Sequence, residues 1–155
     1  MTTPQQLAKH LRELHTGNNV AGVNLRDALA GVTLRQAIEK VHGLNSIAML
    51  VFHVNYYVNV VLKVMQGKPL DAHDKYSFGL GPLETEEAWQ QLVNKAFSEA
   101  EQLAGLIEQM SETQLQEDFA SGKYGNNFRN LLGQVEHTYY HLGQISLIKK
   151  MVQQP

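Results

Sequence analysis

The sequence contains no cysteine, so disulfide bonds and thiolate metal sites are both excluded. Any metal ion bound by this chain must therefore take imidazole or oxygen ligands. The chain also has little excess charge, with 13 basic and 15 acidic residues and a formal net charge of −2 at pH 7. A chain without a basic excess has little to hold a phosphate backbone, and we expect no nucleic-acid partner.

With 155 residues, 43% of them hydrophobic and 18% charged, the chain is typical of a globular protein. We expect a single domain over 1–155 with a substantial buried core. The first 14 residues lack the basic-then-apolar pattern of a signal peptide, which favours a cytoplasmic location.

One stretch has almost no charge at all. No formally charged residue lies between Lys40 and Lys63, a length that approaches a bilayer span. Asn45, Asn55 and Asn59 fall within it, however, largely on one side of a helix. We interpret the stretch as a helix that is buried around most of its circumference, with one wet edge and no membrane partner.

Apolar periodicity predicts four principal helices. The first begins with Thr3 as the cap, Pro4 at the first helical position and Gln6 closing a capping box. A shorter helical stretch is expected at 33–41 and a capped extra turn at Ser111, while 68–83 is a crossover loop. The principal helices cover about 3–16, 44–66, 85–110 and 127–152. Without strand-like alternation, the fold class is all-α, a four-helix bundle with long crossover connections.

Two histidines lie on the buried side of the last predicted helix. His137 and His141 are four residues apart, so their rings leave one face a turn apart and can reach a single metal ion. The opposite, solvent-facing stripe repeats every seven residues and consists of Arg129, Glu136, Gly143 and Lys150.

The second principal helix offers a third ligand. His53 lies on an apolar stripe, where an imidazole needs partners for its ring nitrogens. A divalent cation would satisfy all three histidines at once. The spacing fits ordinary core histidines as well, and periodicity alone does not show that two separate helices converge. His10, His15, His42 and His73 follow no such pattern, and we interpret them as structural or solvent-facing.

Two segments make the sequence resemble a known family. Glu136-His-Thr-Tyr-Tyr-His141-Leu-Gly-Gln-Ile145, followed by Lys149-Lys150, closely resembles the last-helix motif of the DinB-like family, also called YfiT-like. Ser46-Ile-Ala-Met-Leu-Val-Phe-His53 resembles its second-helix motif, in which an apolar run ends at the first metal histidine, and 20–37 looks like its connection between helices one and two. The family comprises metal-dependent hydrolases and thiol-dependent transferases.

The resemblance implies a four-helix bundle with a long crossover and a metal site of His53, His137 and His141. It also implies a homodimer and a small-molecule substrate. The chain departs from many relatives, which have tryptophan near 20–22 and after the first histidine, where Tyr56-Tyr57 stands here, and arginine in place of Leu142. These departures bear on the pocket rather than on the metal ligands, so the substrate of this protein can differ from those of its relatives.

The three histidine ligands limit the reactions that a bound metal could catalyse. Three neutral imidazoles leave a divalent ion its full charge and an open coordination position. Zinc or nickel fits best, and iron also suits such a site. Helical zinc peptidases add a glutamate base inside the motif, whereas this motif encloses Thr138, Tyr139 and Tyr140, and Glu136 faces solvent.

A thiol needs no such base, because coordination can itself remove its proton. The leading hypothesis is a divalent-metal-dependent enzyme that transfers a low-molecular-weight thiol to an electrophilic small molecule, by attack of a thiolate held at the metal. The alternatives are a hydrolase that uses metal-bound hydroxide and a non-catalytic metal-binding stress-response module. Catalytic residues beyond the ligands stay unassigned, and Tyr57, Asn130 and Gln144 are candidate pocket or second-shell groups.

Overall fold

In the computed structural model, which describes residues 1–153, a side chain caps the first turn of each long helix. The Thr2 hydroxyl accepts from the backbone N–H of Gln5 and opens α1 (Thr3–Thr16). The predicted cap at Thr3 was therefore one residue too late, because Thr2/Gln5 and Thr3/Gln6 both have the capping-box spacing. The other long helices are α4 (Ile47–Met65), α5 (Glu86–Glu108) and α7 (Asn127–Val152), capped by Ser46, Thr85 and Asn126.

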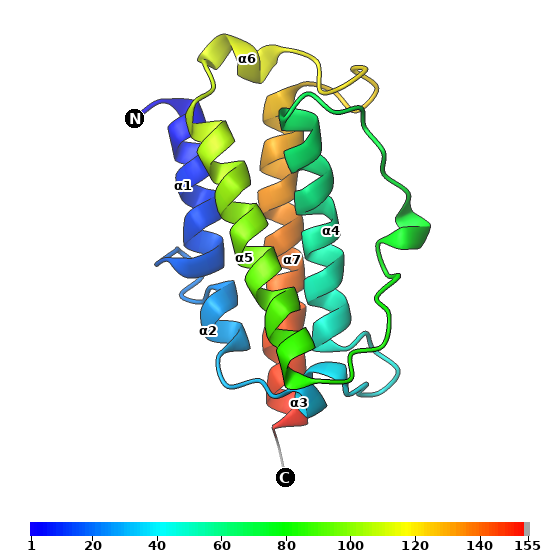
Figure 1. Ribbon diagram of the computed structural model, residues 1–155. Helices are drawn as coiled ribbons and strands as arrows, with labels where there is room; N and C mark the ends of the chain where they lie inside the picture. Colours follow the sequence, from blue (N-terminus) through cyan, green and yellow to red (C-terminus); the bar gives the residue numbers. More distant parts are fainter. Residues whose placement is uncertain (154–155) are drawn as a thin grey trace.

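These four helices pack side by side in the order α1, α5, α4, α7 around the bundle, and α7 closes the ring against α1. Figure 1 shows α1 and α7 running in one direction and α4 and α5 in the other. Because the neighbours α4 and α5 are parallel, the chain must return along the whole bundle between them. Residues 66–85 make this return, so the predicted all-α bundle with a long crossover is confirmed.

Short helices lie in the connections between the long ones. These are α2 (Leu25–Leu29) and α3 (Leu34–Ile38) before α4, the 3-10 turn η1 (Asp74–Tyr76) in the crossover, and α6 (Glu112–Gln116) before α7. The helical stretch expected at 33–41 ends early, and α4 begins later than 44. Glu39 is already extended, with φ −65° and ψ 131°, so α3 ends at Ile38. Farther along, His42 and Gly43 both adopt positive φ, at 50° and 74°, so the chain does not resume a helix directly.

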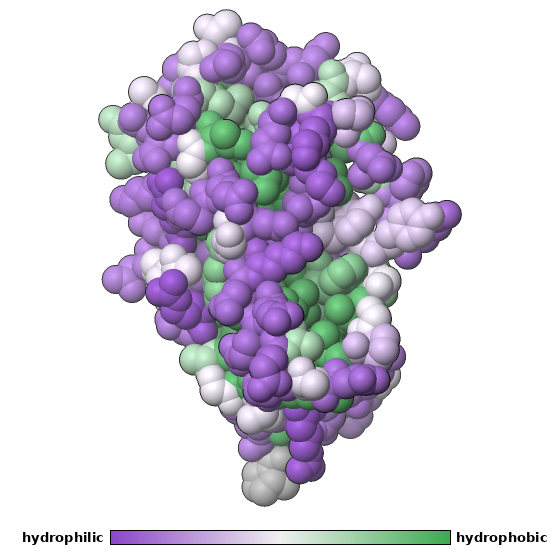
Figure 2. Space-filling view, viewed as in Figure 1, coloured by the Kyte–Doolittle hydropathy of each residue, from purple (hydrophilic) through white to green (hydrophobic). Residues whose placement is uncertain are grey.

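The core is apolar and includes the only tryptophan. Trp89 of α5 is 1% exposed, and its indole N–H donates to the backbone carbonyl of Val32, 2.9 Å away. This bond joins α5 to the turn between α2 and α3. On the outside, polar side chains run along α5 and apolar ones reach the surface beside it, in the lower right of the view (Figure 2).

The apolar helix α4 contains a buried polar contact. By length and composition alone it could cross a membrane, and 61% of its most apolar window is buried within the bundle. The side-chain amides of Asn55 and Asn59 donate to the two carboxylate oxygens of Glu99, at 2.8 and 2.9 Å. Asn55 is only 5% exposed, so the expected wet edge is wrong at this position. A carboxylate from α5 accepts its side-chain N–H, while its Oδ1 atom is buried without a hydrogen-bond partner among the described residues.

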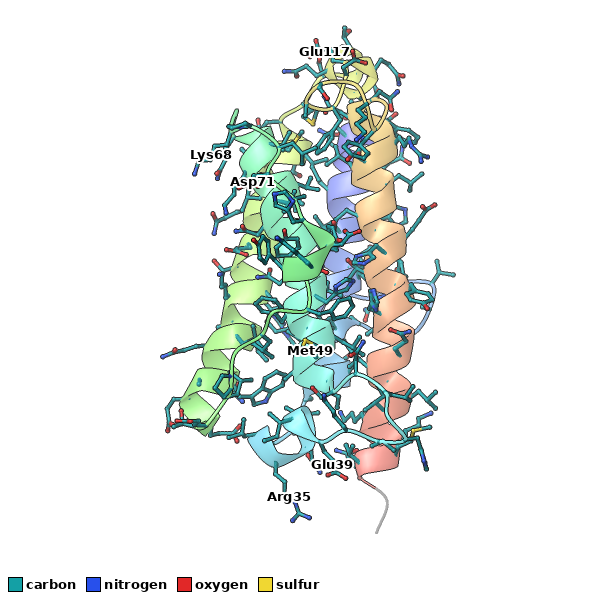
Figure 3. All side chains as sticks on the ribbon, turned by 90° about the vertical axis from the view of Figure 1, so that its right-hand side faces the viewer. Arg35, Glu39, Met49, Lys68, Asp71 and Glu117 are labelled. Carbon is teal, nitrogen blue, oxygen red and sulfur yellow. The ribbon has the colours of Figure 1, made fainter. Side chains whose placement is uncertain are left out.

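The crossover segment lies along the outer side of α4, as the side view shows, with Lys68 and Asp71 marking its start (Figure 3). It is bound there through Tyr56, whose hydroxyl accepts from the His73 backbone N–H at 2.8 Å and lies 3.2 Å from the carbonyl oxygen of the same residue. The crossover is thus packed against the middle of the bundle.

Candidate metal centre

The structure brings together three histidines from the middle of α4 and α7. Nε2 of His137 lies 3.1 Å from Nε2 of His53 and 3.1 Å from Nε2 of His141. The candidate ligand atoms of all three lie within 4.8 Å of one another. His53 and His141 are buried and His137 is half-buried. The antiparallel packing of α4 against α7 therefore makes the three imidazoles face a common point.

The outer ring nitrogens determine the tautomer of two of these histidines. Nδ1 of His53 lies 3.3 Å from the carbonyl oxygen of Ser77, and Nδ1 of His141 lies 2.7 Å from the Oε1 atom of Gln144. Both oxygens can only accept, so each Nδ1 carries the hydrogen. His53 and His141 consequently present Nε2 lone pairs to the centre, the arrangement that second-shell acceptors impose on metal-binding histidines.

His137 then faces two lone pairs at once. It can donate a single Nε2–H, and its buried Nδ1 has no hydrogen-bond partner within the described part of the chain. A cation at the centre would satisfy all three Nε2 atoms. Three nitrogens about 2.0–2.1 Å from a tetrahedral ion are about 3.3 Å apart, close to the separations that His137 makes with both partners. The residues present therefore fit a divalent metal, and the cluster could hold one.

The electrostatics of the cluster agree with this fit. Burial lowers the pKa of His53 and of His141 below the ordinary histidine value. Burial, together with the neighbouring His141 and His53, lowers the pKa of His137 to about 4. All three imidazoles are therefore neutral at pH 7, and the neutral form is the one that binds metals.

The crossover loop covers one side of the cluster. The ring of Phe78 stacks on His53 with centroids 4.0 Å apart and planes 13° apart, next to the Ser77 carbonyl that orients the same imidazole. Sequence reasoning missed Ser77 and Phe78. They lie in an irregular segment, where no periodicity indicates which side chains face the bundle.

The three candidate pocket residues differ in what they contact. The Tyr57 ring lies edge-on to His53 and His137, at 5.3 and 5.1 Å, and its hydroxyl bonds to the Asp74 carboxylate at 2.5 Å. Gln144 contacts His141 directly, as described above. Asn130 instead holds the loop before α7, through an amide that donates to the carbonyls of Tyr124 and Asn126 at 3.0 and 2.8 Å.

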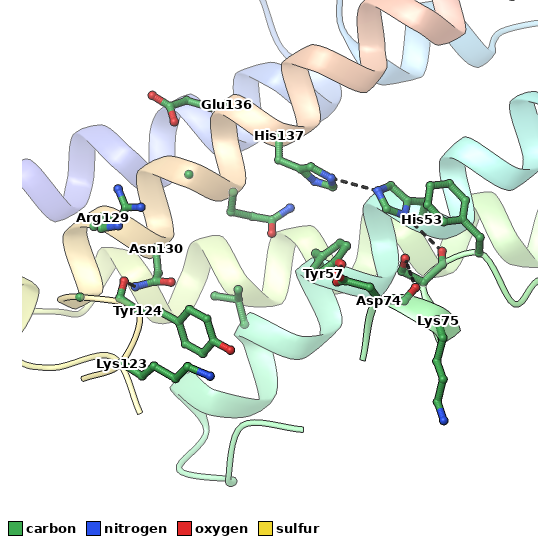
Figure 4. A pocket seen from close by; sticks show the side chains of 16 residues that line it. His53, Tyr57, Asp74, Lys75, Lys123, Tyr124, Arg129, Asn130, Glu136 and His137 are labelled. Carbon is green, nitrogen blue, oxygen red and sulfur yellow. Dashed lines mark hydrogen bonds between the residues drawn. The ribbon is translucent and has the colours of Figure 1, made fainter. Parts of the chain in front are cut away.

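A pocket of about 1060 Å³ opens beside the cluster, between α4, α7, the crossover and the loop that precedes α7. His53, His137, Tyr57 and Asn130 all contribute to its wall, and Figure 4 shows the imidazoles near one end of it. Asp74 also lines this pocket. It is a carboxylate that the sequence pattern did not single out.

The remaining histidines lie outside the cluster. His10, His42 and His73 are exposed, and His15 is buried with Nδ1 2.8 Å from the Leu11 carbonyl oxygen. Their placement agrees with the interpretation of these four as structural or solvent-facing.

A comparison with known proteins and protein families identifies the family of this chain. The model of the DinB superfamily matches residues 20–145, a segment that contains His53, His137 and His141. No curated protein and no solved structure gives a match. Since the matched segment covers most of the sequence, the chain belongs to the DinB superfamily.

Proposed function

We propose that this protein is a divalent-metal-dependent enzyme that transfers a low-molecular-weight thiol to an electrophilic small molecule. His53, His137 and His141 would hold the metal. The observation that carries the proposal is the convergence of three neutral imidazoles, two of which, His53 and His137, line the wall of a pocket. Such a ligand set resembles catalytic rather than structural sites, because it leaves a coordination position free.

A divalent cation held there would act as a Lewis acid that lowers the pKa of a thiol or water in the open position. The protein's own groups keep the centre pre-organised. Ser77 and Gln144 fix the imidazoles of His53 and His141, and Phe78 shields His53 from water. In the net reaction the S–H bond breaks and a C–S bond to the electrophile forms. When the electrophile carries a leaving group, that group takes up the proton. When it is an epoxide or an alkene, the proton goes to the epoxide oxygen or to the alkene carbon.

The residues around the cluster favour a thiol over water as the nucleophile. Among the described residues, no carboxylate belongs to the cluster. The Thr138 hydroxyl is fully buried and donates to the Gln134 carbonyl at 2.8 Å, so it is not free to act as a base. Glu136 is exposed. A thiol is acidic enough to lose its proton without a neighbouring base when its pKa is lowered.

One observation supports hydrolysis as a second candidate. The carboxylate of Asp74 lines the same pocket and is bound to the hydroxyl of Tyr57, which contacts two of the histidines. A carboxylate at this position could accept a proton from water after a small rearrangement. Its existing bond to Tyr57 is the reason that we place hydrolysis second.

Paired rate measurements test the proposal. The metal-loaded protein should accelerate conjugation of small thiols with an electrophile more than it accelerates ester or amide hydrolysis. This excess should vanish in His141→Ala and after chelation, whereas His10→Ala, an exposed control outside the cluster, should retain it. Efficient hydrolysis with no thiol dependence would reverse the order of the two candidates.

A further inference from the structure

The part of the crossover beside the candidate metal centre is held by few contacts. Residues 73–78, here called the docked segment, contain the 3-10 turn η1. Within the described stretch 71–79 only Ser77 is buried, and Phe78 is 42% exposed. A segment with so little buried surface opens locally at a much smaller free energy than the whole bundle unfolds. Its position on α4 therefore depends on a few specific contacts.

Two neighbouring tyrosines of α4 hold the docked segment. The Tyr56 hydroxyl accepts from the backbone N–H of His73 at 2.8 Å, and the Tyr57 hydroxyl donates to the Asp74 carboxylate at 2.5 Å. The two tyrosine rings meet edge-on with their centroids 5.2 Å apart, so each ring supports the other. Both contacts with the segment are made by a hydroxyl oxygen. Phenylalanine at these two positions would therefore keep the packed rings and remove the hydrogen bonds to the segment.

A tight turn connects this attachment to the histidines. Ser77 donates twice to the backbone carbonyl of Asp74, through its N–H at 3.0 Å and through its hydroxyl at 2.7 Å. The carbonyl of Ser77 in turn accepts from Nδ1 of His53 at 3.3 Å, and Phe78 stacks on the same imidazole. Figure 4 shows His53, Tyr57 and Asp74 at the same end of the pocket. The residue bound by Tyr57 and the residue that orients His53 thus belong to one hydrogen-bonded turn.

Undocking of the segment would change His53 in two ways. Its Nδ1–H would lose the Ser77 carbonyl, and its ring would lose the stacked Phe78. Neither the tautomer nor the ring angle of the imidazole would then be fixed. A metal that binds such a histidine must first order it, and the affinity falls accordingly. The docked and undocked forms of the chain therefore differ in their affinity for a metal ion.

We propose that docking of residues 73–78 on α4 and metal binding by the three histidines are coupled, with Tyr56 and Tyr57 as positioning residues. The inference goes beyond the proposed function and rests on it only for a divalent metal at the centre. Thermodynamic linkage requires that the metal stabilise docking by the same factor by which docking strengthens metal binding. Loss of an orienting acceptor weakens metal affinity about 10- to 100-fold, so we expect a coupling factor of this size.

Hydrogen exchange measures the coupling without turnover. The backbone N–H groups of His73, Tyr76 and Ser77 are all hydrogen-bonded while the segment is docked. Saturating zinc should slow their exchange about 10- to 100-fold. The N–H of Gly22, which donates to the Asn19 carbonyl in another loop, should exchange at the same rate with and without zinc. Zinc binding that leaves the exchange of the docked segment unchanged overturns the inference.

A double variant measures the same factor from the metal side. In Y56F/Y57F the docked segment should exchange freely. The Kd of this variant for zinc, measured against a chromophoric chelator, should rise by the factor found from exchange, with its helix content unchanged. In Y56F alone, whose side chain does not line the pocket, exchange of the segment should already be faster. Tyr140→Phe is the matched control, because Tyr140 is exposed and its ring lies 4.9 Å from that of His141, and it should leave both measurements unchanged.

The outcomes of the two measurements separate the inference from the proposed function. Wild-type zinc affinity in a Y56F/Y57F protein whose docked segment exchanges freely overturns the coupling. Slow exchange retained in that variant overturns the assignment of the two tyrosines. Coupling without thiol conjugation would refute the proposed thiol transfer and leave the inference standing, whereas thiol conjugation without coupling would do the opposite.

Discussion

At the scale of single residues, Gln144 determines how His141 faces the centre. Its Oε1 atom accepts the Nδ1 hydrogen and leaves Nε2 free to bind a cation. Ser77 does the same for His53 through a backbone carbonyl, which no side-chain substitution removes. Of these two orienting contacts, therefore, only the one made by Gln144 can be removed by substituting the residue that makes it.

Gln144→Ala should weaken metal affinity about 10- to 100-fold while leaving the bundle folded, since losses of this size follow removal of an orienting acceptor. Competition with a chromophoric chelator measures the affinity. Gln102→Ala, on the exposed face of α5, is the matched control and should bind metal like the wild type. Unchanged affinity in Gln144→Ala would mean that the bond does not orient His141.

The lowered pKa values make the stability of the metal-free protein depend on pH. The pKa of His137 is about 4 in the folded chain and near 6.5 in the unfolded one, so the unfolded chain binds more protons between these values. The contribution of the neutral His137 imidazole to the free energy of unfolding is fully present above pH 6.5 and is lost as the pH falls towards 4. We expect it to be about 1–2 kcal/mol at this half-buried, partly screened position.

Urea unfolding of the metal-free protein between pH 7.5 and 5 measures this loss. In His137→Asn the decline with pH should be shallower, because one titrating group is gone. In His10→Asn, where the imidazole is exposed, the profile should match the wild type. A wild type that gains stability towards pH 5 would contradict the expectation.

At the scale of the helices, one carboxylate makes a polar link between α4 and α5 within a mainly apolar contact. Glu99 accepts from Asn55 and Asn59, and Asn55 is almost completely buried. Glu99→Ala should lower the free energy of unfolding by about 1–3 kcal/mol, because it leaves buried amide donors unsatisfied. Chemical denaturation measures the change. Glu87→Ala, at an exposed position of α5, should cost much less, and equal losses in both variants would show that Glu99 contributes only helix propensity.

Helix periodicity explains which parts of this fold could be predicted. The apolar repeat and the caps gave four long helices close to their observed bounds, and the spacing of His137 and His141 gave their shared face. The role of Asn55 was missed because a polar residue in a pattern counts as exposed, whereas this one is buried and donates to Glu99 of a neighbouring helix. Phe78 and Asp74 were missed because an irregular crossover has no repeat, and its path follows from hydrogen bonds and packing against α4 that periodicity does not reveal.

At the scale of the whole molecule, the candidate centre joins two helices that are distant in sequence. His53 of α4 and His137 of α7 are separated by 84 residues and meet only in the folded state. A metal bound there favours the folded chain over the unfolded one. The centre should therefore contribute to global stability as well as to chemistry.

Metal loading should raise the free energy of unfolding by about 4 kcal/mol when the free ion is near 1,000 times its Kd. Differential scanning calorimetry with and without added zinc measures the effect, and a chelator should reverse it. His137→Ala should show no metal-induced shift, whereas His10→Ala should keep the full shift. A shift that persists in His137→Ala would place the ion elsewhere.

The hydrogen bond of Trp89 has an optical consequence. The chain has one indole, which is buried at the junction of α5 with the turn between α2 and α3, and it does not line the pocket beside the histidines. Its fluorescence should be blue-shifted and resistant to aqueous quenchers such as iodide. Detachment of the α2–α3 connection would expose the ring and move its emission to longer wavelength. The intrinsic fluorescence of this protein therefore monitors one end of the bundle, and a loosening of that end would change it.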